Sequence, residues 1–199
     1  VFIHAHLQKK TVNIKFLSFE LEQVLYFLKT KAYDEDVNKK NLGGTSMVEK
    51  EDKKLEAQAH VDELVQKGLV ALDEFRLLDQ EQVDYIVAKA SVAALDQHGV
   101  LAKHALDETG RGVFEDKATK NLFACEHVVN NMRHTKTVGI ISEDDVTGLT
   151  LIAEPVGVVA GITPTTNPTS TAIFKSLISL KTRNPIVFAF HPSAQESSA

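Results

Sequence analysis

Two loops rich in hydroxyl and amide side chains carry the groups best suited to chemistry in this sequence. Residues 163–169 (TPTTNPT) supply four hydroxyls and one side-chain amide, and residues 191–193 (HPS) form the second loop. Donors of this kind suit a phosphate, a ribose or a developing oxyanion. The same residue types also form ordinary capped turns, so their composition leaves both interpretations open.

Each loop follows a short apolar run bounded by turn residues, at residues 156–162 and 186–190. Runs of this kind are typical of strands buried on both faces in a parallel sheet. Residues 170–182 lie between the two runs and fit a helix. Ligands of open parallel sheets bind beyond the carboxyl ends of the strands, where both loops lie. The sequence therefore predicts a binding site on a β-loop-α-β unit.

Helices are expected before this unit. The first covers residues 47–75, with one apolar face turned to the core. A second begins at Asp79, which has the spacing of a capping box with Gln82, and ends at Gly99. The expected buried face of the first helix consists of Leu55, Val61, Leu64, Val65, Leu69, Leu72 and Phe75.

The middle of the chain changes from helical to strand periodicity. A short helix over residues 101–108 ends at Gly110, and a fourth helix covers residues 114–133. Alternating β-branched residues then predict a hairpin of residues 137–141 and 149–154. The predicted fold class is α/β: a helical N-terminal region, a β-hairpin and the start of a parallel sheet.

The single cysteine, Cys125, lies in the apolar stripe of the fourth predicted helix. A catalytic thiolate requires exposure and a neighbour that lowers its pKa. We therefore interpret Cys125 as a core residue. The stripe consists of Ala118, Leu122, Cys125, Val129 and Met132.

Composition and missing motifs exclude several functions. A net charge of −5 provides no basic footprint for nucleic acid, and no apolar run reaches the roughly 20 residues that cross a membrane. Glycine-rich phosphate loops are absent, and no His or Cys spacing indicates a metal site. One cysteine allows no internal disulfide, which fits a reducing, cytoplasmic compartment.

Residues 1–46 differ in charge from the remainder, because they hold seven Lys and five acidic residues. They end in a loop-like stretch, NKKNLGG at residues 38–44. We interpret residues 1–46 as an N-terminal extension of unknown role, with disorder as one alternative. Met47 is the hypothetical start of translation.

Five motifs occur in order along the C-terminal part of the chain: EPVGVV at 154–159, PTTNPT at 164–169, FKSL at 174–177, KTRNP at 181–185 and HPSA at 191–194. Together they resemble the aldehyde dehydrogenase superfamily, and more closely the CoA-acylating half of the bifunctional aldehyde-alcohol dehydrogenases. Residues 108–110, 115–117 and 120–121 also fit that family, so the resemblance covers about residues 50–199.

The resemblance implies an NAD-dependent reaction of acetaldehyde or acetyl-CoA, with CoA as co-substrate and a thioester on a catalytic Cys. It implies that the side-chain amide of Asn167 helps to hold the oxyanion. His191 with Pro192 is typical of the acylating branch, in which CoA rather than water resolves the thioester. The implied cofactor-binding residues are Ile162, Thr163, Pro164, Thr165, Thr166, Asn167, His191 and Pro192.

By the same resemblance, residues 47–199 form an incomplete N-terminal portion of a cofactor-binding domain with a Rossmann-like sheet. The family's nucleophilic Cys lies downstream of the Asn167 loop, so we expect this chain by itself to be inactive. Full-length relatives form homo-oligomers and helical filaments. A stand-alone module that binds NAD or contacts a filament, without catalysis, is therefore the alternative.

Overall fold

The computed structural model describes residues 47–199, and the side chains of residues 52–199. The predicted N-terminal extension and the hypothetical start at Met47 concern residues outside this described part. Within residues 47–199, no helix combines the length and the apolar character that a membrane span requires.

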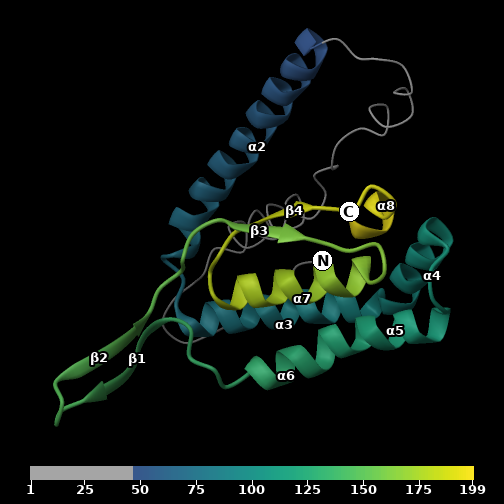
Figure 1. The fold of residues 1–199 in the computed structure, drawn as a ribbon. Helices are drawn as coiled ribbons and strands as arrows, with labels where there is room; N and C mark the ends of the chain where they lie inside the picture. Colours follow the sequence, from purple (N-terminus) through teal and green to yellow (C-terminus); the bar gives the residue numbers. More distant parts are fainter. Residues whose placement is uncertain (1–46) are drawn as a thin grey trace, which may run out of the picture.

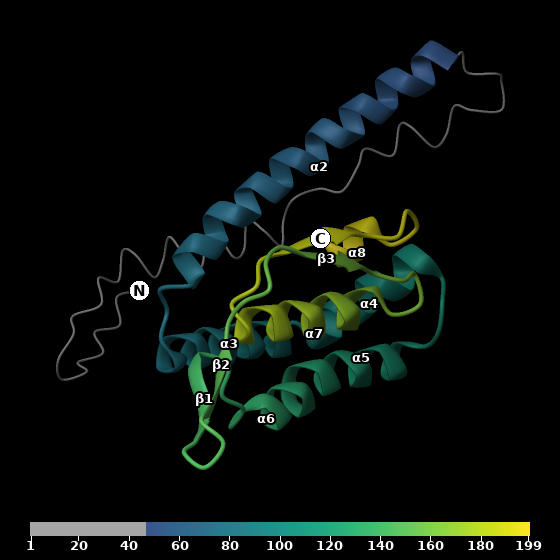
Figure 2. The same cartoon turned by 60° about the vertical axis from the view of Figure 1, so that its left-hand side comes forward.

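Figure 1 shows three layers, in which β3 and β4 cover one side of α7 while α3 and α5 lie on its other side. Helix α2 and the β1–β2 hairpin extend away from these layers in both views (Figures 1 and 2). In chain order the elements are α2 (Met47–Phe75), α3 (Gln80–Asp96), α4 (His98–Thr109), α5 (Phe114–Phe123), the π-helical turn η2 (Ala124–Val128), α6 (Val129–Met132), β1 (Gly139–Asp144), β2 (Leu149–Ala153), β3 (Val159–Ile162), α7 (Pro168–Lys181), β4 (Ile186–Ala189) and α8 (Gln195–Ser198).

The start of α3 confirms the predicted capping box. The Asp79 carboxylate accepts from the backbone N–H of Gln82, and the Gln82 side chain accepts from the N–H of Asp79, each at 2.9 Å. The predicted end at Gly99 is wrong, because α3 ends at Asp96 and Gly99 lies inside α4. Helix α4 ends at Gly110 as expected, where a φ of 61° favours a residue without a Cβ.

Helix α2 exists as predicted, but only the C-terminal part of its predicted buried face meets the core, where Phe75 packs against the buried cluster. Leu55, Val61 and Leu69 are 57%, 52% and 41% exposed, whereas Leu72 is buried. Both views show that only the C-terminal turns of α2 approach the layered part of the molecule. A helical repeat indicates that one side is apolar, but a neighbouring element must exist before that side is buried.

The core lies between α3 and α7. Leu78, Val83, Ile86, Val87 and Leu177 form one buried cluster there. Cys125 packs at the edge of this layer with 1% of its surface exposed, which confirms it as a core residue.

The predicted fourth helix covers the expected residues but includes a π-helical turn, and its buried side extends beyond the apolar stripe. Ala118, Leu122, Val129 and Met132 are only partly buried, whereas Lys117 and Asn121 are buried. The apolar stripe therefore located the helix and part of its buried side, since Cys125 is buried and Val129 and Met132 pack against the core cluster. It missed the buried polar residues Lys117 and Asn121.

The hairpin and the parallel strands are confirmed. Strands β1 and β2 pair antiparallel, and β3 pairs with β4 in parallel. The expected burial of the parallel strands on both faces is wrong, since Ile162 is 70% exposed and Val156, just before β3, is 87% exposed. The reason is that α7 covers one face of the two-stranded sheet in the described part of the chain.

Candidate functional site

The two predicted loops leave the same edge of the β3–β4 sheet. Register pairs Ile162 with Ala189 at the last position of each strand. The backbone N–H of Thr163 then donates to the carbonyl of Ala189 at 3.1 Å. The first loop therefore begins beside the end of β4, from which the second loop continues to His191, as the sequence predicted.

The first loop contains two hydroxyls that have no hydrogen-bond partner among the described residues. These are the Oγ1 atoms of Thr163 and Thr165, and both atoms are buried. Thr163 itself is only 1% exposed. An unpartnered buried hydroxyl costs about 1–3 kcal/mol, so both atoms are suited to bond a polar ligand.

Three lysines donate to this loop. Lys175 Nζ donates to the carbonyl of Ile162 at 2.6 Å, and Lys117 Nζ donates to the carbonyl of Thr166 at 3.1 Å. Lys120 Nζ donates to Asn167 Oδ1 at 2.9 Å. Within residues 52–199, none of these three ammonium groups has a carboxylate within ion-pair distance. The loop therefore lies in a positive environment that favours an anionic ligand.

Lys117 is the most unusual of these lysines because it is buried, with 5% of its surface exposed. Loss of water around the ammonium group, together with the nearby charge of Lys120, lowers the pKa of Lys117. Its neighbour on α5, Asn121, is fully buried: it donates to the His98 carbonyl and accepts from Thr169 Oγ1. Helix α5 thus holds both the loop and the start of α7.

Asn167 joins the loop to α7 in an unusual way. Asparagine often caps a helix with its side chain, yet the Asn167 side chain makes no capping bond to α7, which begins with Pro168. Its Oδ1 instead accepts from Lys120, and its Nδ2 has no partner among the described residues. The amide N–H groups are therefore available to a ligand.

In the second loop, His191 and Pro192 are exposed. The Nδ1 of His191 accepts from the backbone N–H of Ser193 at 3.1 Å, so in the neutral ring Nε2 carries the proton. Ala194 is buried, and its N–H closes the turn on the His191 carbonyl at 2.9 Å.

Glu108 on α4 fixes the end of this second loop. Its carboxylate accepts from the backbone N–H groups of Glu196 and Ser197 at 2.9 and 2.8 Å. Partial burial by itself raises the pKa of Glu108, but the bonds from Ser197, Glu196 and Gln195 outweigh it and lower the pKa. Helix α4 therefore supports the loop that carries His191.

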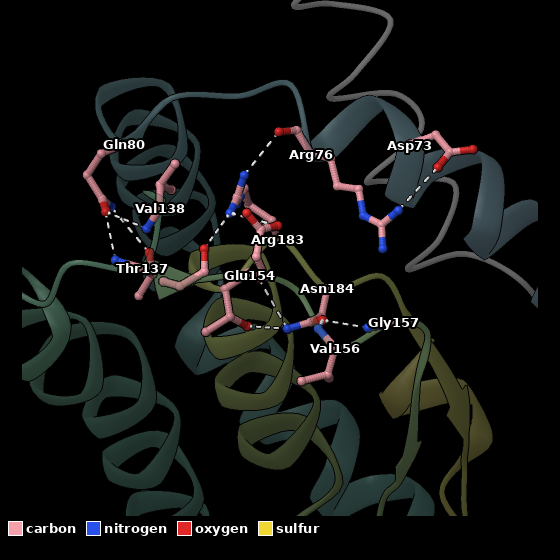
Figure 3. Close-up of polar contacts among 12 residues, drawn as sticks. Asp73, Arg76, Gln80, Thr137, Val138, Glu154, Val156, Gly157, Arg183 and Asn184 are labelled. Carbon is pink, nitrogen blue, oxygen red and sulfur yellow. Dashed lines mark hydrogen bonds and ion pairs between the residues drawn. The ribbon is translucent and has the colours of Figure 1, made fainter. Parts of the chain in front are cut away.

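A second polar cluster lies at the other end of α7 (Figure 3). The Arg183 guanidinium donates to the carbonyls of Arg76 and Ala153, and the Asn184 Oδ1 accepts from the N–H groups of Val156 and Gly157. These bonds join the end of α2, the end of β2 and the segment before β3. Because the Arg183 and Asn184 side chains form hydrogen bonds to backbone groups, we assign this cluster to positioning the sheet.

The roles of the lysines and of Asn121 were missed from the sequence. Lys117, Lys120, Asn121 and Lys175 all lie in the motifs quoted above, yet no role could be assigned to them. The available signal was spacing, because positions 117, 120 and 121 share one side of a helix. Among the described residues, no group of three or more His, Cys, Asp or Glu could hold a metal ion.

Individual known proteins match this chain in sequence and in structure. No model of a known protein family matches the chain. The aldehyde-alcohol dehydrogenase of Streptococcus pneumoniae is 88% identical over 149 residues, which cover 75% of this chain and 17% of that protein. This chain therefore spans less than a fifth of the length of that curated relative.

Solved structures lead to the same group of proteins. An acetylating aldehyde dehydrogenase from Geobacillus thermoglucosidasius matches with a TM-score of 0.71 and 46% identity, over 73% of this chain and 32% of that chain. An engineered glycolyl-CoA reductase with bound NADP+ matches with a TM-score of 0.55 and 29% identity, over 69% and 31% of the two chains. These matches confirm the predicted α/β class with the start of a Rossmann-like sheet.

Proposed function

This chain belongs to the aldehyde-alcohol dehydrogenase family, a family of oxidoreductases, and we propose that its segment serves the CoA-acylating oxidation of acetaldehyde. In this reaction acetaldehyde, CoA and NAD give acetyl-CoA and NADH. We propose that this reaction is carried out in the cytoplasm by a complete enzyme that contains the segment. The resemblance to acetylating enzymes supports this choice over aldehyde oxidation with water.

NAD would supply the hydride acceptor of this reaction. The residues present fit such a group, because Thr163 and Thr165 hold unpartnered buried hydroxyls in a loop surrounded by lysines. Hydroxyls suit the ribose, and positive charge suits the pyrophosphate. The residues that would hold NAD are Ile162, Thr163, Pro164, Thr165, Thr166, Asn167, His191 and Pro192. The NADP+ of the engineered glycolyl-CoA reductase supports a nicotinamide cofactor.

The observation that carries this function is the Asn167 Nδ2, which has no partner among the described residues, in the same loop as the unpartnered hydroxyls of Thr163 and Thr165. We assign Asn167 Nδ2 as a donor to the oxyanion that forms when a thiolate attacks the aldehyde carbonyl. A donor placed in advance where negative charge develops lowers the barrier without rearrangement. The thiolate and the thioester belong to the complete enzyme.

The test uses a chimera, defined as the complete Streptococcus pneumoniae relative in which the 149 matched residues are those of this chain. We expect Asn167→Ala to lower kcat of CoA-dependent acetaldehyde oxidation about a hundredfold, the usual cost of one oxyanion donor. The rate is compared as kcat at saturating NAD, because Asn167 also lies among the residues proposed to hold NAD. Asn130→Ala, an exposed residue of α6, is the control with an unchanged rate. An unchanged kcat in Asn167→Ala would remove Asn167 from this role.

A module that binds NAD without catalysis remains the second candidate, because both ligand-facing loops are complete in this chain. Titration calorimetry of the 199-residue chain with NAD tests it. Binding without acetaldehyde oxidation supports the module. The absence of both binding heat and a thermal shift would count against the module. Oxidation of acetaldehyde by this chain alone would contradict the inactivity expected from its sequence.

A further inference from the structure

We propose that Lys120 is a positioning residue that determines which end of the Asn167 amide faces the reacting carbonyl. This inference rests on the proposed oxyanion role of Asn167. Lys120 Nζ lies 2.9 Å from Asn167 Oδ1. An ammonium group only donates, so it bonds the oxygen of the amide and not the nitrogen. The NH₂ end is thereby turned away from Lys120 and left without a partner among the described residues.

The direction of the amide matters because its two ends are nearly equal in shape and opposite in polarity. With Nδ2 towards the carbonyl, Asn167 donates to the developing oxyanion. With Oδ1 there, it presents a lone pair to negative charge and raises the barrier. A charge-assisted hydrogen bond from Lys120 favours the first arrangement more strongly than a neutral donor would.

The surrounding contacts keep the backbone of the loop still while Lys120 acts on the side chain. Lys117 and Asn121, one turn before and one residue after Lys120, hold the Thr166 carbonyl and the Thr169 hydroxyl. Both are buried, whereas Lys120 is exposed. Lys120 can therefore be replaced without opening the packing of α5.

Three substitutions of Lys120 in the chimera distinguish orientation from general support. Lys120→Arg keeps a cationic donor and should keep kcat within about threefold. Lys120→Met removes the donor and should lower kcat about three- to tenfold, because both amide orientations become populated. Lys120→Glu offers only an acceptor, which bonds Nδ2 and turns Oδ1 to the site, so kcat should approach that of Asn167→Ala. All rates are compared as kcat at saturating NAD, because Lys120 also adds positive charge beside the proposed NAD site.

Two controls separate this effect from charge and folding. Lys89→Glu makes the same charge change on α3, where Lys89 lies over the Tyr85 ring, and should leave kcat unchanged. Lys120→Glu added to Asn167→Ala should cost nothing further, because the amide it orients is gone. An equal kcat in the Arg, Met and Glu variants, or an additive loss in the double variant, would overturn the positioning role.

The same set of variants shows which statement fails. If Asn167→Ala lowers kcat but the Lys120 series does not follow the order Arg, Met, Glu, only the positioning role of Lys120 is wrong. If Asn167→Ala leaves kcat unchanged, the oxyanion role is wrong, and the positioning role falls with it.

Discussion

At the scale of single residues, this site uses polar groups that lie in otherwise buried positions. Lys117 and Asn121 hold backbone and hydroxyl groups of the loop, although apolar side chains would pack there more easily. Burial makes these bonds strong, because water cannot compete for the groups. Burying Lys117 and Asn121 costs desolvation free energy, which is consistent with a function that requires the loop to keep a single conformation.

Cys125 shows the opposite case, a reactive group made inert by its surroundings. Burial, with a smaller contribution from Glu126, raises the pKa of its thiol to about 11 from 9.0. The neutral thiol is favoured by folding, so this contribution to stability is complete below pH 9.0 and disappears as the pH rises through about 11.

We expect the free energy of unfolding of the 199-residue chain to fall between pH 9 and pH 11 more steeply than that of Cys125→Ala, which lacks the thiol. Denaturant titrations at pH 8, 9.5 and 10.5 measure the difference. The Cys125→Ala chain is less stable at every pH because of its cavity, so only the slope is compared. Parallel curves would contradict the shift.

At the scale of elements, one side chain holds three segments together. Arg183 follows α7 with a φ of 56°, a left-handed backbone that residues with a Cβ rarely adopt. Its guanidinium donates to Arg76 and Ala153, and Figure 3 shows it between the end of α2 and the hairpin. Glycine would adopt this backbone without strain, so the hydrogen bonds of the guanidinium group explain why an arginine is present at this position.

We predict that Arg183→Ala lowers the free energy of unfolding by about 2–4 kcal/mol, because two part-buried carbonyls lose a charged donor. Arg183→Gly loses the same bonds but relieves the left-handed backbone, and should be about 1 kcal/mol more stable than Arg183→Ala. Denaturant unfolding of the chain measures both. The exposed Arg133→Ala is the matched control. An Arg183→Gly chain less stable than Arg183→Ala would contradict the backbone argument.

At the scale of the molecule, the hairpin leaves apolar side chains in water on both faces. Ile140, Leu149, Leu151 and Ile152 are 47–69% exposed. The hairpin also extends from the layered part in both views. A projecting ribbon of this composition is suited to bury its apolar side chains against a second copy of the enzyme, as the homo-oligomer implied by the family resemblance would require.

We expect Leu151→Glu in the chimera to reduce its molar mass in solution, as measured by analytical ultracentrifugation, because a carboxylate cannot be buried in an apolar contact. Leu77→Glu makes the same change at an exposed position outside the hairpin and should leave the mass unchanged. An oligomer that persists in Leu151→Glu would show that the hairpin is not the contact.

The sequence by itself determined what depends on near neighbours in the chain. The cap at Asp79, the end of α4 at Gly110, the hairpin and the two strands with their loops follow from patterns a few residues long. Both loops of the candidate site were located in this way. The family was also accessible, because its motifs are local strings of residues.

Only the tertiary structure decided which faces meet. The exposed side of α2 and the partly open strands could not be foreseen, because burial depends on the neighbour and not on the repeat. The bonds from Lys117, Lys120 and Asn121 to the loop and the start of α7 join residues 47 to 49 positions apart. No local pattern specifies such a pairing, since it arises only when packing brings α5 against the start of α7. The sequence therefore determined that Asn167 is present, and the fold determined which way its amide points.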